Sequence, residues 1–249
     1  MLLCAVASLL FLTAASPGRS VGADPTPEHW TYQGSEGAAH WGMLSLAYMA
    51  CEAGSHQSPI NIAMPRHART QEQLARMYLP ASGQVLHTGH TIQVNVQAGG
   101  GVFLNGRPYV LRQFHFHEPS EHHVDGRTYP MELHLVHDDA RGHILVIGVL
   151  LDVGADNQAL ETIWKQLPGT VGERVAIPDL NVSALLPANT HHFSYHGSLT
   201  TPPCTEGVQW VVLREHLTVS KEQIRKFISL VGHNARPVQP LHGRRVIVK

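Results

Sequence analysis

Short segments in which apolar and polar residues alternate recur along this chain, and they constrain its fold more than any other feature. A period of two places successive side chains on opposite faces of a β-strand. Segments of this kind lie at 90–96, 102–106, 113–117, 131–137 and 144–153. Turn dipeptides such as Asn105-Gly106 and Asp125-Gly126 lie between them, as expected between strands. The pattern therefore predicts a β-dominated chain.

Helical segments are fewer. One is predicted at 157–167, where Pro168-Gly169 would stop it. A second is predicted at 220–230, where Ser220 and Gln223 have the spacing of a capping box. The chain has 249 residues, 43% of them hydrophobic, and no repeat or Pro/Gly/Ser-rich linker divides it. These features favour a single β-dominated domain of the α+β class with a few short peripheral helices.

The N-terminus has the composition of a secretory leader. Residues 2–15 form an apolar run that is short for a membrane span, which needs roughly 20 apolar residues. Small-residue cleavage patterns end at Ala15 and at Ala23, although no Lys or Arg precedes the run. We predict a signal peptide at 1–23, with cleavage after Ala15 as an alternative; a buried N-terminal helix is the competing interpretation. We expect no membrane span in the mature chain.

The cysteine count and the net charge limit the cellular compartment and the kinds of partner that this protein can have. Cys4 belongs to the predicted leader, so the mature chain keeps Cys51 and Cys204. A cysteine pair in an exported protein favours a disulfide, with two buried free thiols as the alternative. The net charge is −1 and the pI is about 7.0, so no basic surplus favours nucleic-acid binding.

Two of the alternating segments are rich in histidine. In QFHFH (113–117) the polar residues share one strand face, and in MELHLVH (131–137) Glu132 and His134 do the same. If the two strands pair antiparallel, three histidines converge on one face while Phe and Leu side chains are buried on the other. Three neutral imidazoles with an open fourth position form a catalytic zinc arrangement. Gln113 and Glu132 are placed to accept the second N–H of a ligand histidine.

Two other interpretations compete with zinc. The chain has 19 histidines, so an isolated His-x-His on a strand is more often a solvated polar stripe. The spacing of His115, His117 and Glu121 also resembles the first half of a cupin metal motif, which would make Glu121 a ligand. The second, Gly/Pro-rich half of that motif is not found in proper form.

The chain resembles the α-class carbonic anhydrases of the bacterial secreted type. The resemblance runs from HWTY at 29–32 to the C-terminus. It rests on segments in matching order and spacing: QSPINI (57–62), GHTIQV (89–94), QFHFHEPSEHHVDG (113–126), ELHLVH (132–137), GSLTTPPCTEGVQW (197–210) and NARPVQPL (234–241). Their combination is much more specific than any one of them.

This resemblance implies a carbonate dehydratase, a lyase that reversibly hydrates carbon dioxide to bicarbonate and a proton. The cofactor would be Zn²⁺, bound by His115, His117 and His134. Zinc would lower the pKa of a bound water to about 7, a value known for carbonic anhydrases, and the resulting hydroxide would attack carbon dioxide. The same hydroxide would give weak esterase activity.

Further family positions are matched as well. The acceptors of hydrogen bonds from the ligands match Gln113 and Glu132, with either the side chain or the backbone of Asn234 as a further candidate. Thr200 matches the hydroxyl that accepts from the hydroxide and donates to Glu121. His90 matches the proton shuttle, a role that suits an unperturbed pKa near 6.5. The substrate pocket matches Val136, Val146, Leu199, Thr201, Val208 and Trp210.

Other residues near these positions receive weaker assignments. Outside its motif, His90 would be an ordinary surface histidine at a hairpin. His87 either supplements His90 or is a surface residue, and we leave both open. We interpret His122 and Tyr195 as buried structural residues, and His123 receives no role.

The resemblance also carries expectations for the whole protein. Residues 24–249 would form one domain around a central, mostly antiparallel twisted sheet of about ten strands. Cys51 and Cys204 match the disulfide of secreted members, which indicates a periplasmic or secreted protein. The partners would be carbon dioxide and bicarbonate, and a homodimer is compatible with bacterial members. The main rival is a non-catalytic carbonic-anhydrase-like binding domain, because some relatives lose ligand histidines.

Overall fold

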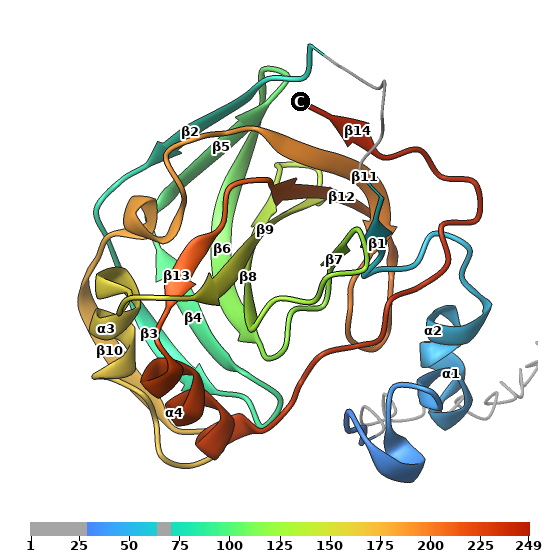
Figure 1. Ribbon diagram of the computed structural model, residues 1–249, viewed down its shortest axis with the longest axis horizontal. Helices are drawn as coiled ribbons and strands as arrows, with labels where there is room; N and C mark the ends of the chain where they lie inside the picture. Colours follow the sequence, from blue (N-terminus) through green and yellow to red (C-terminus); the bar gives the residue numbers. More distant parts are fainter. Residues whose placement is uncertain (1–28, 64–70) are drawn as a thin grey trace, which may run out of the picture.

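The computed structural model describes residues 29–63 and 71–249, so the predicted leader lies outside the described residues. A twisted sheet of twelve strands dominates the described chain (Figure 1). Its main path runs in the order β10-β3-β4-β6-β8-β9-β12-β11-β14, with β5 beside β6, β2 beside β5, and β13 beside β9. A separate parallel pair is formed by β1 and β7.

The strand bounds follow the alternating segments closely. The first strands are β1 (Asn61–Ile62), β2 (Leu74–Tyr78), β3 (Ala81–His87), β4 (Ile92–Gln97), β5 (Gly100–Leu104), β6 (Arg107–His117) and β7 (His123–Val124). The later strands are β8 (Met131–Asp138), β9 (Ile144–Val153), β10 (Arg174–Leu180), β11 (His192–Ser198), β12 (Glu206–Leu213), β13 (Leu217–Val219) and β14 (Ile247–Val248). All five predicted strand segments are confirmed.

The sheet is mostly antiparallel, as predicted. Within it, β9 pairs parallel with β12 and with β13, whereas the other pairs are antiparallel. Twelve strands are present where the family resemblance implied about ten, and two of them, β13 and β14, have only three and two residues. Asn105 and Gly106 turn β5 into β6, and both have positive φ, as the sharp turn requires.

The helices are short and peripheral. The longest are α3 (Gln158–Trp164) and α4 (Lys221–Val231), and the N-terminal segment adds α1 (Trp41–Leu44), α2 (Ala50–Ala53), η1 (Gly34–Glu36) and η2 (Leu46–Tyr48), with η3 (Val182–Leu185) after β10. Ser220 caps α4 in the predicted capping box with Gln223. The α3 helix ends at Trp164, three residues before the predicted Leu167. No helix in the described part is long and apolar enough to cross a membrane.

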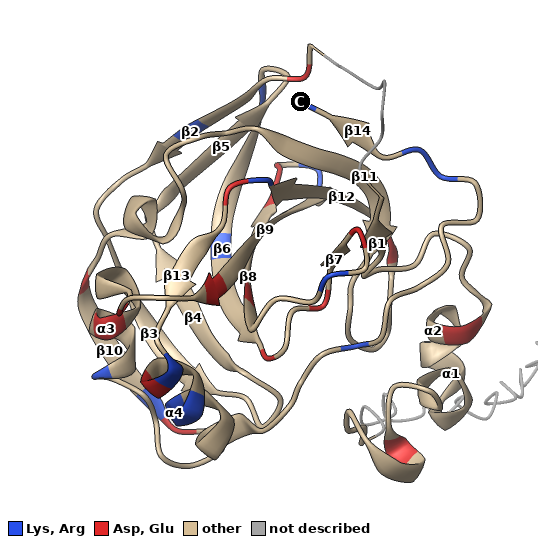
Figure 2. Ribbon diagram, viewed as in Figure 1, with Lys and Arg blue, Asp and Glu red and all other residues tan. Residues whose placement is uncertain are grey.

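The two faces of β6 and β8 are occupied as alternation predicts. Phe114, Phe116, Leu133 and Leu135 are fully buried in the larger apolar core. Helices α3 and α4 cover this face, where the Phe116 ring packs edge-on against Trp164 at 5.0 Å between centroids. Burial of these side chains holds the strands in register, so the opposite face can carry polar residues. Figure 2 shows acidic and basic residues interspersed along the described chain, with both signs on α4.

Cys51 and Cys204 form the expected disulfide across a sequence separation of 153 residues. Both cysteines are buried with Trp41 and Tyr48 in a small cluster beneath the N-terminal helices. The bond therefore ties the N-terminal segment to the loop between β11 and β12. This loop carries Thr200, so the disulfide also restrains the chain next to the histidine-bearing strands.

Reducing this disulfide should destabilise the protein. Closing a loop of this length stabilises by roughly 4–5 kcal/mol if the effect is entirely the lost entropy of the unfolded chain. We expect the free energy of unfolding, measured in urea, to fall by up to that amount on reduction. A Cys51→Ala/Cys204→Ala variant should match the reduced protein and should not respond to reductant. An unchanged unfolding curve for the reduced natural chain would contradict the prediction.

Candidate metal centre

Strands β6 and β8 bring the three predicted histidines together. The two strands pair antiparallel, with His115 opposite His134 and His117 opposite Glu132. The ring centroids of the three histidines lie 4.5–5.3 Å apart. One ring nitrogen from each lies within 4.8 Å of the others. Register on the sheet, rather than closeness in sequence, therefore creates the cluster.

Each ring is held by one oxygen acceptor. His115 donates from Nδ1 to Gln113 Oε1 at 2.8 Å, and His134 donates from Nε2 to Glu132 Oε1 at 2.9 Å. His117 donates from Nδ1 to the backbone carbonyl of Asn234 at 2.8 Å, which settles that the backbone of Asn234 makes this contact. Because these acceptors carry no proton, each histidine donates its N–H to the acceptor. In the neutral ring, the other nitrogen then carries a lone pair.

The nitrogens that remain fit a bound metal ion. They are Nε2 of His115, Nε2 of His117 and Nδ1 of His134. Nε2 of His117 is buried without any hydrogen-bond partner, which is costly for a polar atom unless something binds it. Burial lowers the pKa of His117 to about 4 and holds that of His115 well below its usual value. Both are therefore neutral at physiological pH, as metal ligands must be.

The Glu132 carboxylate is fully buried and accepts four hydrogen bonds. Oε2 accepts the backbone N–H groups of Glu121 and His122 at 2.9 and 2.8 Å. Oε1 accepts from the rings of His122 and His134 at 2.7 and 2.9 Å. Burial alone would raise the pKa of Glu132, but the two facing histidines outweigh it and lower the pKa well below its usual value. The residue is thus a fixed anion behind the cluster.

His122 and Tyr195 extend this contact to the other side of the site. His122 contacts the Tyr195 hydroxyl at 2.7 Å, and that hydroxyl contacts Ser58 Oγ at 2.9 Å. Ser58 in turn bonds the backbone and side chain of Ser198, two residues before Thr200. All these side chains are buried. The chain of contacts links Glu132 to the loop that carries Thr200, which agrees with a structural role for His122 and Tyr195.

Glu121 lies beside the cluster in a second fixed position. Its Oε1 accepts the backbone N–H of Arg236 at 2.8 Å, and the Thr200 hydroxyl is close enough to the carboxylate to lower its pKa. Its Oε2 has no hydrogen-bond partner and lies 3.5 Å from His117 Nε2. Burial raises the pKa of Glu121 to about 7, against the lowering effects of His134, Arg236 and Thr200. The pairing of Glu121 with Thr200 is the arrangement that the resemblance implies.

The predicted apolar residues also gather in one place. Val146, Val208 and Trp210 are buried in a second apolar cluster, against which Val136 and Leu199 pack. The Trp210 ring lies 4.8 Å from the His134 ring, centroid to centroid. Thr201 follows Thr200 in the same loop and is half-buried. The structure therefore brings these side chains next to the histidine cluster.

His90 lies in the turn between β3 and β4 and is half-buried. Its ring stacks on Trp30, with centroids 3.7 Å apart and planes 9° from parallel. Burial, and then the nearby His29, lower the pKa of His90 below 6.5. The side chain of Asn234 donates to the His90 carbonyl at 3.0 Å, so Asn234 holds both this turn and the His117 ring.

Several supporting residues were missed or misplaced by the sequence reasoning. Trp30 and the buried Arg236 fall within HWTY and NARPVQPL, but neither segment shows by itself what the side chain touches. His87 is 4% exposed, so the surface interpretation of it is wrong.

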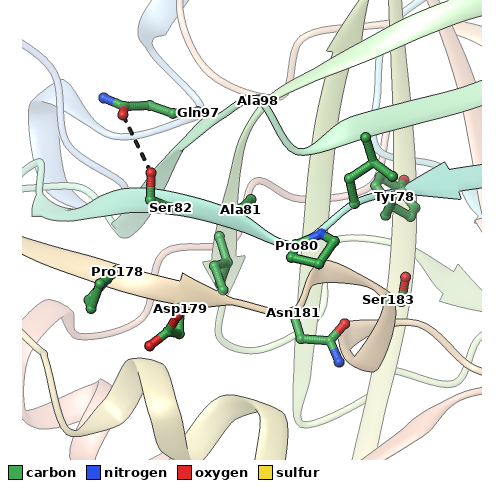
Figure 3. A pocket seen from close by; sticks show the side chains of 12 residues that line it. Tyr78, Pro80, Ala81, Ser82, Gln97, Ala98, Pro178, Asp179, Asn181 and Ser183 are labelled. Atoms are coloured by element: carbon green, nitrogen blue, oxygen red, sulfur yellow. Dashed lines mark hydrogen bonds between the residues drawn. The ribbon is translucent and has the colours of Figure 1, made fainter.

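A hollow of about 810 Å³ lies elsewhere, at the edge of the sheet. Figure 3 shows it between the start of β3 and the end of β10, with Tyr78 and Asn181 on its walls. Ser82 and Gln97 hydrogen bond to each other at its side, at 3.5 Å. None of the three clustered histidines lines it.

Comparison of the sequence and the fold with known proteins shows the family to which this chain belongs. A family description, eukaryotic-type carbonic anhydrase, matches residues 36–249. A carbonic anhydrase of Pectobacterium atrosepticum is 43% identical over 222 residues, covering 88% of this chain and 90% of that protein. The α-carbonic anhydrase of Thermovibrio ammonificans, solved with sulfanilamide, has a TM-score of 0.86 and 42% identity, over 89% of this chain and all of that one. Dioscorin, solved with ascorbate, has a TM-score of 0.84 and 29% identity, over 89% of this chain and 98% of that one.

The sheet that carries the three histidines therefore has the fold of a carbonic anhydrase. The chain belongs to the α-carbonic anhydrase family and is an enzyme of the lyase class. The family's reaction is the reversible hydration of carbon dioxide. Membership overturns the cupin interpretation, in which Glu121 would be a ligand.

Replacing Glu132 by Gln should weaken metal binding. The amide keeps the volume but brings an NH₂ group against four donors, so at least one of them loses its acceptor. Loss of such a partner behind a ligand weakens metal affinity by about 10–100-fold. We expect that loss in a zinc competition titration. Glu173→Gln is the matched control, because Glu173 also accepts two backbone N–H groups but lies on the surface. Equal zinc affinity in both variants would contradict the prediction.

Proposed function

We propose that this chain binds one Zn²⁺ through His115, His117 and His134 and hydrates carbon dioxide at that site. The single observation that carries the proposal is the set of three converging nitrogens, one of them buried and without a partner. Their opposite nitrogens are bonded to Gln113, Asn234 and Glu132, so the free lone pairs have fixed directions. Three imidazoles leave a fourth position open for a reacting water.

Zinc, when bound, supplies a Lewis acid that lowers the pKa of water to about 7, as is known for carbonic anhydrases. The cation would also lower the pKa of Glu121 and keep it ionised. An ionised Glu121 accepts a hydrogen bond from the Thr200 hydroxyl, so the Thr200 oxygen can only accept a hydrogen bond from the attacking oxygen. The two residues thereby aim a lone pair of that oxygen at carbon dioxide.

The remaining roles concern substrate and proton. Carbon dioxide has no charge or net dipole, so an apolar wall next to the histidines would hold it. That wall would consist of Val136, Val146, Leu199, Val208 and Trp210, with Thr201 beside them. His90 would take the released proton outward. A histidine side chain can both accept and release a proton near neutral pH, and burial lowers the pKa of His90, which favours release of the proton. Weak esterase activity stays a prediction from the same chemistry.

Export and domain bounds belong to the same proposal. We infer a mature domain at 24–249, preceded by a signal peptide at 1–23, in a periplasmic or secreted protein. Two observations support export: the Cys51–Cys204 disulfide and the apolar run at 2–15. Carbon dioxide and bicarbonate are the expected partners, and a homodimer stays a prediction.

A non-catalytic binding domain is the rival function. The shared fold does not exclude it, since dioscorin has the same fold and was solved with ascorbate. The retained histidines, Thr200 and Glu121 favour catalysis. A carbon dioxide hydration assay with and without a zinc chelator, combined with a count of zinc per chain, decides between the two. Zinc-loaded protein without hydration activity would overturn the proposal.

Replacing His134 by Ala should abolish zinc binding at stoichiometric concentration and reduce hydration to the background rate. The fold should persist, because the apolar face of β8 is untouched and the far-ultraviolet circular dichroism reports mainly the sheet. His123→Ala is the matched control, since His123 is half-buried and bonds Thr128 rather than any ligand. Zinc retained by the His134→Ala protein at one per chain would contradict the assigned ligand set.

Replacing His90 by Ala should slow proton release and leave the attack on carbon dioxide intact. We expect kcat to fall roughly tenfold or more in weak buffer, with kcat/KM unchanged. Free imidazole should restore kcat, because it replaces the missing proton carrier. If turnover of both proteins is insensitive to buffer, the assigned shuttle is wrong.

A further inference from the structure

His87 lies at the end of β3, three residues before His90, and both of its ring nitrogens are bonded. The backbone N–H of Gly89 donates to Nδ1 at 3.1 Å. Nε2 lies 3.2 Å from the carbonyl oxygen of Leu230, in the last turn of α4. A peptide N–H can only donate and a carbonyl can only accept, so His87 is neutral with its proton on Nε2.

The His87 ring holds one peptide of a turn whose two ends are closed by Thr88 and Thr91. The Thr88 N–H donates to the Thr91 carbonyl at 3.0 Å, and the Thr91 N–H donates to Thr88 Oγ1 at 3.0 Å. Gly89 has φ +91°, a conformation that an L side chain rarely adopts, and a Cβ there would lie 3.3 Å from Val171. Thr88 Oγ1 accepts the backbone N–H of His90 at 3.1 Å, and Asn234 holds the His90 carbonyl at 3.0 Å. The peptide between these points, that of Gly89, is held by the His87 ring.

The contact with helix α4 holds the His87 ring in a fixed position. Carbonyl groups in the last turn of a helix lack a partner within the helix, and Leu230 uses the His87 ring instead. Helix α4 is itself anchored by the buried Phe227 and by its capping box. The backbone of His87 is also held on both sides, by Gly172 to its carbonyl at 2.7 Å and by Glu173 to its N–H at 3.3 Å.

We propose that His87 is a positioning residue for His90, acting through the Gly89 peptide. It fixes the direction in which the His90 ring leaves the turn and meets Trp30. His87 does not carry the proton itself, because both ring nitrogens are engaged and the side chain is buried. The proposal rests on the proposed role of His90 as the proton carrier.

Two conservative substitutions separate the two bonds of the ring. In His87→Asn, Oδ1 can replace Nδ1 and accept from Gly89, but the side chain is too short to reach Leu230. In His87→Gln, Nε2 can replace the ring Nε2 and donate to Leu230, but no acceptor faces Gly89. Both variants lose one bond and the ring, so a general loss of stability should affect them about equally.

The experiment measures kcat and kcat/KM for carbon dioxide hydration in weak buffer and with added imidazole. We expect His87→Gln to lose kcat severalfold in weak buffer, to recover with imidazole and to keep kcat/KM. His87→Asn should stay close to the natural protein. Thermal unfolding and zinc content are measured alongside, and His87→Gln/His90→Ala should turn over no more slowly than His90→Ala alone.

The outcomes distinguish the two proposals. Equal kcat in the Asn and Gln variants, or a parallel fall of kcat and kcat/KM in His87→Gln, would overturn the positioning role of His87. Those results would leave the role of His90 intact if His90→Ala still responds to imidazole. A His90→Ala protein without any buffer dependence would instead overturn the proposed shuttle.

Discussion

The rest of the site depends on the hydrogen bonds that the buried Glu132 carboxylate accepts. A buried, unpaired carboxylate is very costly, and here four donors offset that cost. Those donors belong to the ring of His134, the ring of His122 and the two peptides that carry Glu121 and His122. One anion therefore fixes the tautomer of a proposed ligand, anchors the contacts that run toward the Thr200 loop and places the backbone of Glu121, which we propose orients Thr200.

The surrounding structure delivers these groups through a few long-range contacts. Sheet register places His115 opposite His134, and the fully buried Phe and Leu face holds that register. Asn234 links the ring of His117 to the turn of His90. Arg236 holds Glu121 by its backbone, while its guanidinium bonds the carbonyl of Cys51 at 2.8 Å. The disulfide then returns to the loop after β11. The proposed ligands, the proposed proton carrier His90 and Thr200 thus share supporting residues. A substitution at one supporting residue should therefore affect more than one of these proposed functions.

The sequence predicted most of what depends on local pattern. Alternation separated the histidine-bearing face of β6 and β8 from the apolar face, and the capping box at Ser220 and Gln223 was correct. What depends on distant partners was less accessible. The parallel pairing of β9 with β12, the backbone contact of Asn234 and the burial of His87 against α4 arise from contacts between residues far apart in sequence. Local periodicity does not encode such contacts, and only the family resemblance pointed to the residues that make them.

The central claim is that three ring nitrogens bind zinc and leave one position for water. X-ray absorption at the zinc edge of the purified enzyme tests it most directly, because the spectrum counts ligands by type. We expect four light ligands, three imidazole nitrogens and one oxygen, at about 2.0–2.1 Å. A carboxylate in place of an imidazole, a sulfur ligand or a six-coordinate metal would contradict the assignment of His115, His117 and His134.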